Sequence, residues 1–162
     1  MSRKVFFSFH YERDAWRVAQ VRNSNLLTKE EKTQFLDKAD WEEVKLGGDN
    51  AIKNWIDEQL KGTSITIVLI GSETEGRKWI DYEIKQSYKK GNALLGIYVH
   101  NIKNQNSETD IKGKNPFDSW HIKDVYFSSI YKSYDWVHDE GRDNISKWIE
   151  EAIKLNNDFR KT

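Results

Sequence analysis

A tryptophan and a glutamate four residues apart, Trp79 and Glu83, are the residues of this sequence best suited by type and spacing to chemistry. Four residues is about one helical turn, so the two side chains are neighbours on one helix face. They follow an apolar, β-branched run, Ile65 to Ile70, and a polar loop, Gly71 to Lys78. If the run is a strand of a parallel sheet, Glu83 stands near the carboxyl edge of that sheet, where open α/β sheets bind ligands.

Further polar and aromatic side chains are expected at the same edge, around the first and third predicted strands. They are Phe9, His10, Tyr11, Asp37 and Trp41. Carboxylates that cluster with such groups in a cleft are candidates for catalysis. The pattern alone leaves a plainer explanation open, since a glutamate on an amphipathic helix is usually a solvated flank residue.

Several common sites are excluded by the residues at the corresponding positions. The loop after the first strand, Ser8 to Arg13, contains no glycine, so neither a dinucleotide fingerprint nor a P-loop is present. A receiver domain needs an aspartate at the end of the third strand, where this chain has Gly71 and Ser72. Ser72 is not in a G-x-S-x-G elbow either, which argues against a Ser-His-Asp hydrolase.

Metal and cysteine chemistry are not expected. The chain has no cysteine, so it has no disulfide, thiol nucleophile or thiolate metal site. Its four histidines lie on separate elements without the spacing of metal ligands; they are His10, His100, His121 and His138. We expect neither a metal nor a resident cofactor.

The charge balance and the hydropathy bear on partners and compartment. Lys plus Arg and Asp plus Glu number 26 each, so no net positive field supports nucleic-acid binding. No stretch approaches the ~18 apolar residues of a membrane span, and the apolar run near the N-terminus is too short for a signal peptide. We therefore expect a cytoplasmic protein that binds neither nucleic acid nor membrane.

Alternating strands and helices would position the candidate residues. Strands are predicted at Lys4–Phe9, Thr33–Leu36, Ile65–Ile70 and Leu94–Val99, with a fifth at either Val125–Ser128 or Ile130–Tyr134. Three helices are predicted to begin at the N-caps Asp14, Asp49 and Asp143, and a further helix carries Ile80, Ile84 and Tyr88 on one face. The segment Asp37 to Gly48 is polar with one embedded tryptophan, and the tail after Asn156 is expected to fray.

This alternation predicts an α/β fold: a flavodoxin-like doubly wound, mostly parallel five-stranded sheet with helices on both faces. The 162 residues suit a single domain over 1–162, which would bury roughly 70% of its unfolded surface. A long polar loop is expected at about 101–119, and loops of that length are usually functional or mobile.

Segments spread over nearly the whole chain, from Lys4 to about Ile149, resemble one family. They read KVFFSFHY, GTSITIVLIGSET, RKWIDYEI, LLGIYVH, NPFD and YDWV, in that order. The first resembles the first box of TIR domains, and WIDYEI (Trp79 to Ile84) resembles the W-x-x-x-E motif of TIR enzymes that cleave NAD. Together they resemble the TIR-like family of the Thoeris antiphage sensors called ThsB.

The resemblance implies a TIR-like domain that breaks the nicotinamide–ribose bond of NAD and makes a signalling nucleotide, commonly a cyclic ADP-ribose isomer. That product would activate a separate effector protein. NAD is then the substrate, and no cofactor is needed. The resemblance places the catalytic glutamate at Glu83 and the substrate pocket at Phe9, His10 and Tyr11, with Asp37, Trp41 and Trp79 as further contributors.

This chemistry needs few groups. Nicotinamide leaves as a neutral molecule, so no general acid is required, and a desolvated carboxylate can stabilise the oxocarbenium-like ribose. Flat nicotinamide and adenine rings can stack on aromatic side chains, for which the candidates are Phe9, Tyr11, Trp41 and Trp79.

The sequence departs from the usual TIR pattern at one point, and two alternative functions stay open. Many TIR domains carry a proline in the loop after the second strand, whereas Asp40 to Asp49 has none, which argues against an assembly contact of the adaptor type. The oligomeric state, including a homo-oligomer, is left open. The alternatives are a noncatalytic TIR-like interaction module, in which Glu83 is a flank charge, and an N-glycosidic enzyme resembling nucleoside deoxyribosyltransferases.

Overall fold

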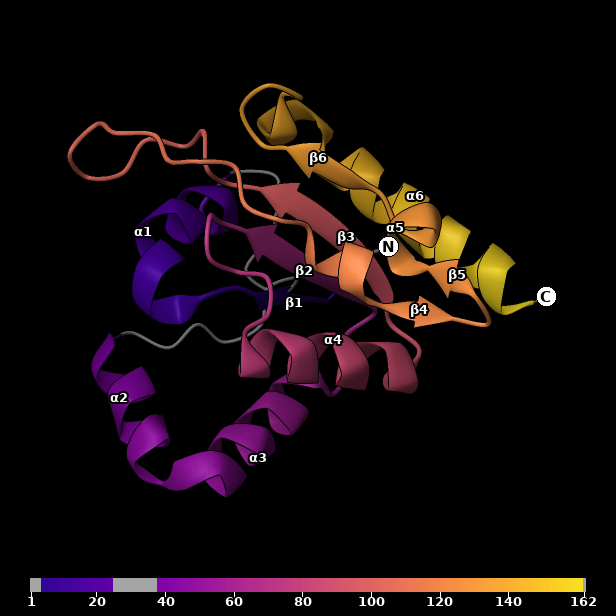
Figure 1. Ribbon diagram of the computed structural model, residues 1–162, viewed down its shortest axis with the longest axis horizontal. Coiled ribbons are helices and arrows are strands. Elements are labelled where there is room, and N and C mark those ends of the chain that lie inside the picture. The colour runs from indigo at the N-terminus through magenta and orange to yellow at the C-terminus, as the bar shows by residue number, and fades with distance from the viewer. Residues whose placement is uncertain (1–3, 25–37, 162) are drawn as a thin grey trace.

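A parallel β-sheet organises the chain (Figure 1). The computed structural model describes residues 4–24 and 38–161, and within them four strands pair in the order β1-β2-β3-β6. These strands are β1 (Val5–Ser8), β2 (Ile65–Ile70), β3 (Ala93–Tyr98) and β6 (Ser133–Asp135). All three pairings are parallel, with Phe7 opposite Ile67 and Ile67 opposite Leu95. The α/β fold with a parallel sheet is therefore confirmed.

The predicted second strand, Thr33–Leu36, lies outside the described residues. The two alternatives for the last strand are resolved in favour of the second, since β6 overlaps Ile130–Tyr134. Val125–Tyr126 instead forms β5, which pairs antiparallel with β4 (His121–Ile122) in a separate small sheet, and α5 (Phe127–Ile130) follows it.

Alternate strand residues point to opposite faces, and each face is covered by helices. On one face, side chains such as Phe7, Ile67 and Leu95 pack with α1 (Tyr11–Arg22) and α6 (Gly141–Arg160). On the other face, the intervening residues pack against α3 (Gly48–Leu60) and α4 (Lys78–Lys90). Burial on both faces explains why β2 is a continuous apolar run and not an alternating one.

The predicted N-caps Asp14, Asp49 and Asp143 are wrong by two to four residues, because the N-caps are His10, Gly47 and Glu140. The helices α1, α3 and α6 begin at Tyr11, Gly48 and Gly141, so each aspartate lies inside the first turn. The reason is that acidic side chains also stabilise the first turn through the partial positive charge of the helix N-terminus. An aspartate therefore marks a helix start without fixing its first residue.

A helix that the pattern does not predict, α2 (Lys38–Leu46), occupies the polar segment before α3. Trp41 and Val44, three residues apart, share one face and pack against the cluster that contains Ile52 and Ile56 of α3. Two apolar residues in a short polar segment do not form a recognisable helical pattern in the sequence. The helical conformation of α2 therefore depends on its packing against α3.

The expected fraying after Asn156 is also wrong. Asn156 is 3% exposed, accepts a hydrogen bond from the Tyr131 hydroxyl at 2.7 Å and another from Arg160 Nε at 3.0 Å. The Arg160 guanidinium also lies 4.2 Å from the ring centre of Tyr88. These contacts keep α6 helical to Arg160.

The long segment after β3 is held against the domain at several points. Arg17 of α1 donates to the carbonyl oxygens of Ile102 and Glu108 at 2.6 and 2.9 Å, and Arg13 forms an ion pair with Asp110 at 2.6 Å. The segment ends in the short 3₁₀ helix η2 (Pro116–Ser119). In the described part of the chain, no helix combines the length and apolarity that crossing a membrane requires.

Candidate active site

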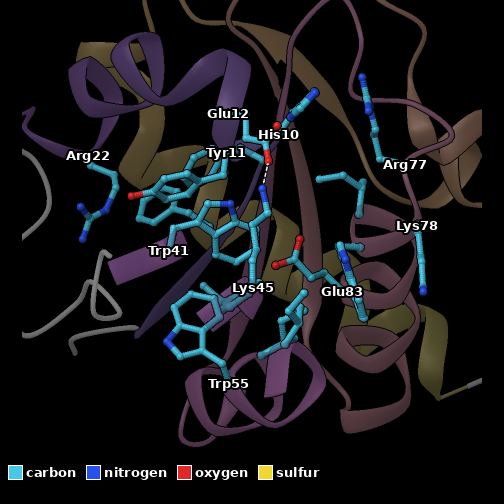
Figure 2. A pocket seen from close by; sticks show the side chains of 17 residues that line it. His10, Tyr11, Glu12, Arg22, Trp41, Lys45, Trp55, Arg77, Lys78 and Glu83 are labelled. Carbon is cyan, nitrogen blue, oxygen red and sulfur yellow. Dashed lines mark hydrogen bonds and ion pairs between the residues drawn. The ribbon is translucent and has the colours of Figure 1, made fainter. Parts of the chain in front are cut away.

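A cavity of about 320 Å³ opens at the carboxyl end of β1 (Figure 2). Its walls come from β1, the β1–α1 junction, α1, α2, α3 and the start of α4. Six of the seven candidate residues from the sequence line it: Phe9, His10, Tyr11, Trp41, Trp79 and Glu83. The seventh, Asp37, lies outside the described residues. The cavity is at the small end of ligand pockets, which span roughly 300–1,000 Å³.

Glu83 lies at the inner end of the cavity and is 7% exposed. It lies on the inward face of α4, next to the fully buried Ile84, so the helix that packs on the sheet also carries the carboxyl group inward. The hydroxyl of Ser8, at the end of β1, donates a 2.7 Å hydrogen bond to its Oε1. The solvated-flank explanation of Glu83 is therefore wrong.

The protonation of Glu83 reflects this burial. Loss of solvent raises the pKa of Glu83 to about 8, and the Ser8 hydrogen bond acts in the opposite direction. In the ligand-free cavity the neutral acid predominates at pH 7. A cationic ligand beside the carboxyl group would favour the ionised form.

The aromatic candidates form a connected wall. The rings of Phe9 and Tyr11 stack with centres 5.4 Å apart, and Tyr11 stacks on Trp41 at 5.1 Å. Trp41 meets Trp55 of α3 edge-on at 6.2 Å. These rings come from three different helices and a loop, and together they offer flat apolar faces to a ligand.

Trp79 and His10 complete the predicted set. Trp79 meets Tyr82 edge-on at 5.8 Å, and the Lys78 ammonium lies 4.9 Å from the centre of a Trp79 ring. His10 occupies the N-cap position of α1. Burial, reinforced by the charge of Arg77, lowers the pKa of His10, so its imidazole is neutral at pH 7.

The sequence patterns do not point to several polar and aromatic residues in or beside the cavity. Among them are Ser8, which bonds Glu83, and the lining residues Glu12, Arg22, Lys45, Trp55, Arg77 and Lys78. Ser8 falls within the first quoted segment, KVFFSFHY, which could have marked it. Lys45 carries no such signal, because it belongs to the unpredicted helix α2.

Three of the basic side chains that line the cavity are paired with carboxylates. Lys45 of α2 pairs with Glu12 of α1, the contact drawn as a dashed line in Figure 2. Lys78 pairs with Asp49 at 2.5 Å, and Arg77 pairs with Glu73 at 3.3 Å. Among residues 4–24 and 38–161, no group of three or more His, Asp or Glu side chains is arranged to hold a metal ion.

The comparison with known proteins settles the family. Residues 6–104 match the family described as "Thoeris protein ThsB, TIR-like domain". The chain belongs to the ThsB TIR-like family. The matched segment contains all but the first residue of β1, together with β2, α4 and β3, and therefore both Ser8 and Glu83.

A relative supports the same assignment of this ThsB-family chain over a greater length. The protein of Bacillus cereus (strain MSX-D12) named "Putative cyclic ADP-D-ribose synthase ThsB1" is 34% identical to it. The alignment covers 92% of this chain and 100% of the relative. The family resemblance drawn from the sequence segments is thus confirmed.

Proposed function

We propose that this ThsB-family chain cleaves the nicotinamide–ribose bond of NAD and converts the ADP-ribosyl part into a signalling nucleotide, a cyclic ADP-ribose isomer. In this proposal the product activates a separate effector protein in antiphage defence, and neither a metal nor a cofactor takes part. The observation that carries the proposal is the buried Glu83 carboxyl group, held by Ser8 at the inner end of an aromatic cavity. The name of the Bacillus cereus relative, a cyclic ADP-ribose synthase, supports it.

The bond changes need one anionic group. As the N-glycosidic bond breaks, its electron pair returns to the nicotinamide ring nitrogen, which loses its positive charge. The ribose carbon becomes cationic, and the Glu83 carboxylate stabilises it at close range in a medium of low dielectric constant. Water or a hydroxyl group of the same molecule then forms the new bond and releases its proton to solvent. A ring nitrogen of the same molecule instead forms the bond through its lone pair, and the positive charge passes to the base. Only the intramolecular route gives a cyclic product.

The raised pKa of Glu83 is compatible with this role. NAD brings a positive charge on its nicotinamide ring, and an opposite charge within a few ångströms lowers the pKa of a carboxyl group. Substrate binding would therefore ionise Glu83 at the point where the anion is needed. The aromatic wall of Tyr11 and Trp41, together with Trp79, offers stacking surfaces for the flat nicotinamide and adenine rings.

The proposal is tested by incubating purified protein with NAD, with and without extract from phage-infected cells, and measuring nicotinamide release. Mass spectrometry of the remaining nucleotides identifies linear or cyclic ADP-ribose. We expect Glu83→Gln to reduce release by about 100-fold or more, because it removes the charge that stabilises the transition state. Glu58→Gln, at an exposed site on α3 outside the cavity lining, is the matched control.

The outcomes separate the proposal from its alternatives. No nicotinamide release under either condition would reject it. Equal release by wild type and Glu83→Gln would remove Glu83 from catalysis. Cleavage of deoxynucleosides in a parallel incubation, with NAD left intact, would favour an enzyme of the deoxyribosyltransferase type.

A further inference from the structure

A second cavity, of about 340 Å³, adjoins the first. Both cavities are lined by Tyr11, Glu12, Trp41 and Lys45. These shared residues form the wall between them, with Tyr11 and Glu12 from α1 and the other two from α2. The cavity that contains Glu83 is here called the inner cavity, and the second one the outer cavity.

Two contacts make up the wall. One is the stack of Tyr11 on Trp41, and the other is the ion pair between the Lys45 ammonium and the Glu12 carboxylate. The Lys45 and Glu12 side chains are 34% and 55% exposed, and Lys45 also lies 3.7 Å from Glu42 of its own helix. Exposed ion pairs contribute little to stability, so a competing anion can replace Glu12 at little cost.

Lys45 differs from the other basic residues of the inner cavity in position. Among the described lining residues, it is the one basic side chain that faces both cavities. Arg77 is held by the backbone oxygen and the carboxylate of Glu73, and Lys78 pairs with Asp49. A ligand that passes from one cavity to the other therefore meets Lys45 at the crossing.

We propose that Lys45 binds the diphosphate of a dinucleotide substrate, and that its ion pair with Glu12 breaks when it does. The inference rests on the proposed function, because it takes the nicotinamide ribose to lie beside Glu83 in the inner cavity. In the proposed arrangement the adenosine half extends past the shared wall into the adjoining outer cavity. The diphosphate that joins the two halves then lies at the wall, where the ammonium of Lys45 is the available cation.

In this arrangement the Glu12 carboxylate and the substrate diphosphate compete for the Lys45 ammonium group. Removing the Lys45 charge weakens dinucleotide binding, whereas removing the Glu12 charge frees Lys45 and strengthens it. A purely structural ion pair predicts something different, since loss of either partner would then perturb the same contact between α1 and α2 in the same direction. The sign of the Glu12 effect distinguishes the two roles.

The experiment measures NAD binding by calorimetry in the Glu83→Gln background, where turnover does not interfere. We expect Lys45→Gln to raise the Kd about tenfold or more, as loss of a charged hydrogen bond does. Lys45→Arg should restore most of the affinity, and Glu12→Gln should lower the Kd about twofold or more. Lys61→Gln and Glu58→Gln are the controls, because they break an exposed Lys–Glu pair of α3 that lines neither cavity.

Three results would overturn the inference: no NAD binding, an unchanged Kd in Lys45→Gln, or weaker binding in both Lys45→Gln and Glu12→Gln. Thermal unfolding of each variant verifies that it is folded. Nicotinamide release by the wild type is measured separately. Lys45-dependent binding without release rejects the proposed function alone, whereas release with Lys45-independent binding rejects this inference alone.

Discussion

Burial and a hydrogen bond act in opposite directions on the pKa of Glu83. The carboxyl group is 7% exposed, and the Ser8 hydroxyl is the group that bonds it. Burial raises the pKa of Glu83 to about 8, so at pH 7 only about a tenth of the free protein carries the carboxylate. The kcat/KM for NAD reports groups of the free enzyme, so we expect it to rise with pH, to reach half its plateau near pH 8 and to level off above that.

The Ser8 hydrogen bond makes this expectation testable at one residue. Because that bond lowers the pKa of Glu83, Ser8→Ala should raise it further and shift the kcat/KM profile to higher pH. A bond to a charged group is worth about 1.5–3 kcal/mol, so kcat/KM at pH 7 should fall about tenfold or more. The measurement is nicotinamide release as a function of pH.

The matched control is Ser87→Ala on the same helix. Ser87 is fully buried and its hydroxyl bonds Thr66 at 2.6 Å, one turn beyond Glu83. Ser87→Ala should lower the stability of the protein about as much as Ser8→Ala does, and it should leave the pH profile of kcat/KM unchanged. A Ser8→Ala profile that overlays the wild type would show that Ser8 does not tune Glu83.

At the scale of elements, the segment after β3 is fixed by backbone packing. Gly113 lies so close to Gly71, at the end of β2, that a Cβ atom on Gly113 would overlap the Gly71 carbonyl oxygen. The same region contains the contacts of Arg17 with Ile102 and Glu108. The polar composition of this segment is typical of a mobile loop, but these contacts hold it against the carboxyl ends of the strands.

Gly113→Ala tests this packing. The added methyl group meets backbone atoms, which cannot turn aside as a flexible side chain does. We expect the free energy of unfolding to fall by about 1–3 kcal/mol, the usual cost of overpacking, as measured by denaturant titration. Lys114→Ala, at the exposed neighbouring position, should change stability little. Equal stability of the two variants would contradict the close approach.

At the scale of the whole molecule, two buried carboxyl groups link stability to pH. Besides Glu83, Asp14 of α1 is 1% exposed, and burial raises its pKa from 3.8 to about 6. Each of these two carboxyl groups therefore binds its proton more tightly in the folded protein than in the unfolded chain. The stabilisation is therefore complete below the unfolded pKa values and is lost as pH rises through the folded ones.

We expect the free energy of unfolding to decrease as pH rises from 5 to 8, by at most about 1.4 kcal/mol per pH unit for each group. Glu83→Gln removes the ionisation and should flatten the part of the curve between pH 6 and 8. Asp14→Asn should flatten the part below pH 6. Denaturant titration across this range is the measurement, and an unchanged slope in Glu83→Gln would contradict the raised pKa.

Local patterns in the sequence determine much of the sheet and its flanking helices. The apolar run Ile65 to Ile70 is β2 at the predicted bounds, and the helix carrying Ile80 and Ile84 follows it as α4. Both follow from hydrophobic periodicity, which records burial residue by residue. The spacing of Trp79 and Glu83 likewise places both on one side of α4, and the quoted segments identify the family.

Only the tertiary structure decides which partners these side chains meet. Glu12 and Lys45 stand 33 residues apart, on two helices joined by residues outside the described part of the chain, and no local pattern encodes their ion pair. Ser8 reaches Glu83 because β1 and α4 are packed together, 75 residues apart in sequence. Periodicity reports whether a residue is buried, whereas the partner of a buried polar group depends on how separate elements pack. Packing places Glu83 beside Ser8 at an aromatic cavity, and the sequence alone leaves it either there or on a solvated helix flank.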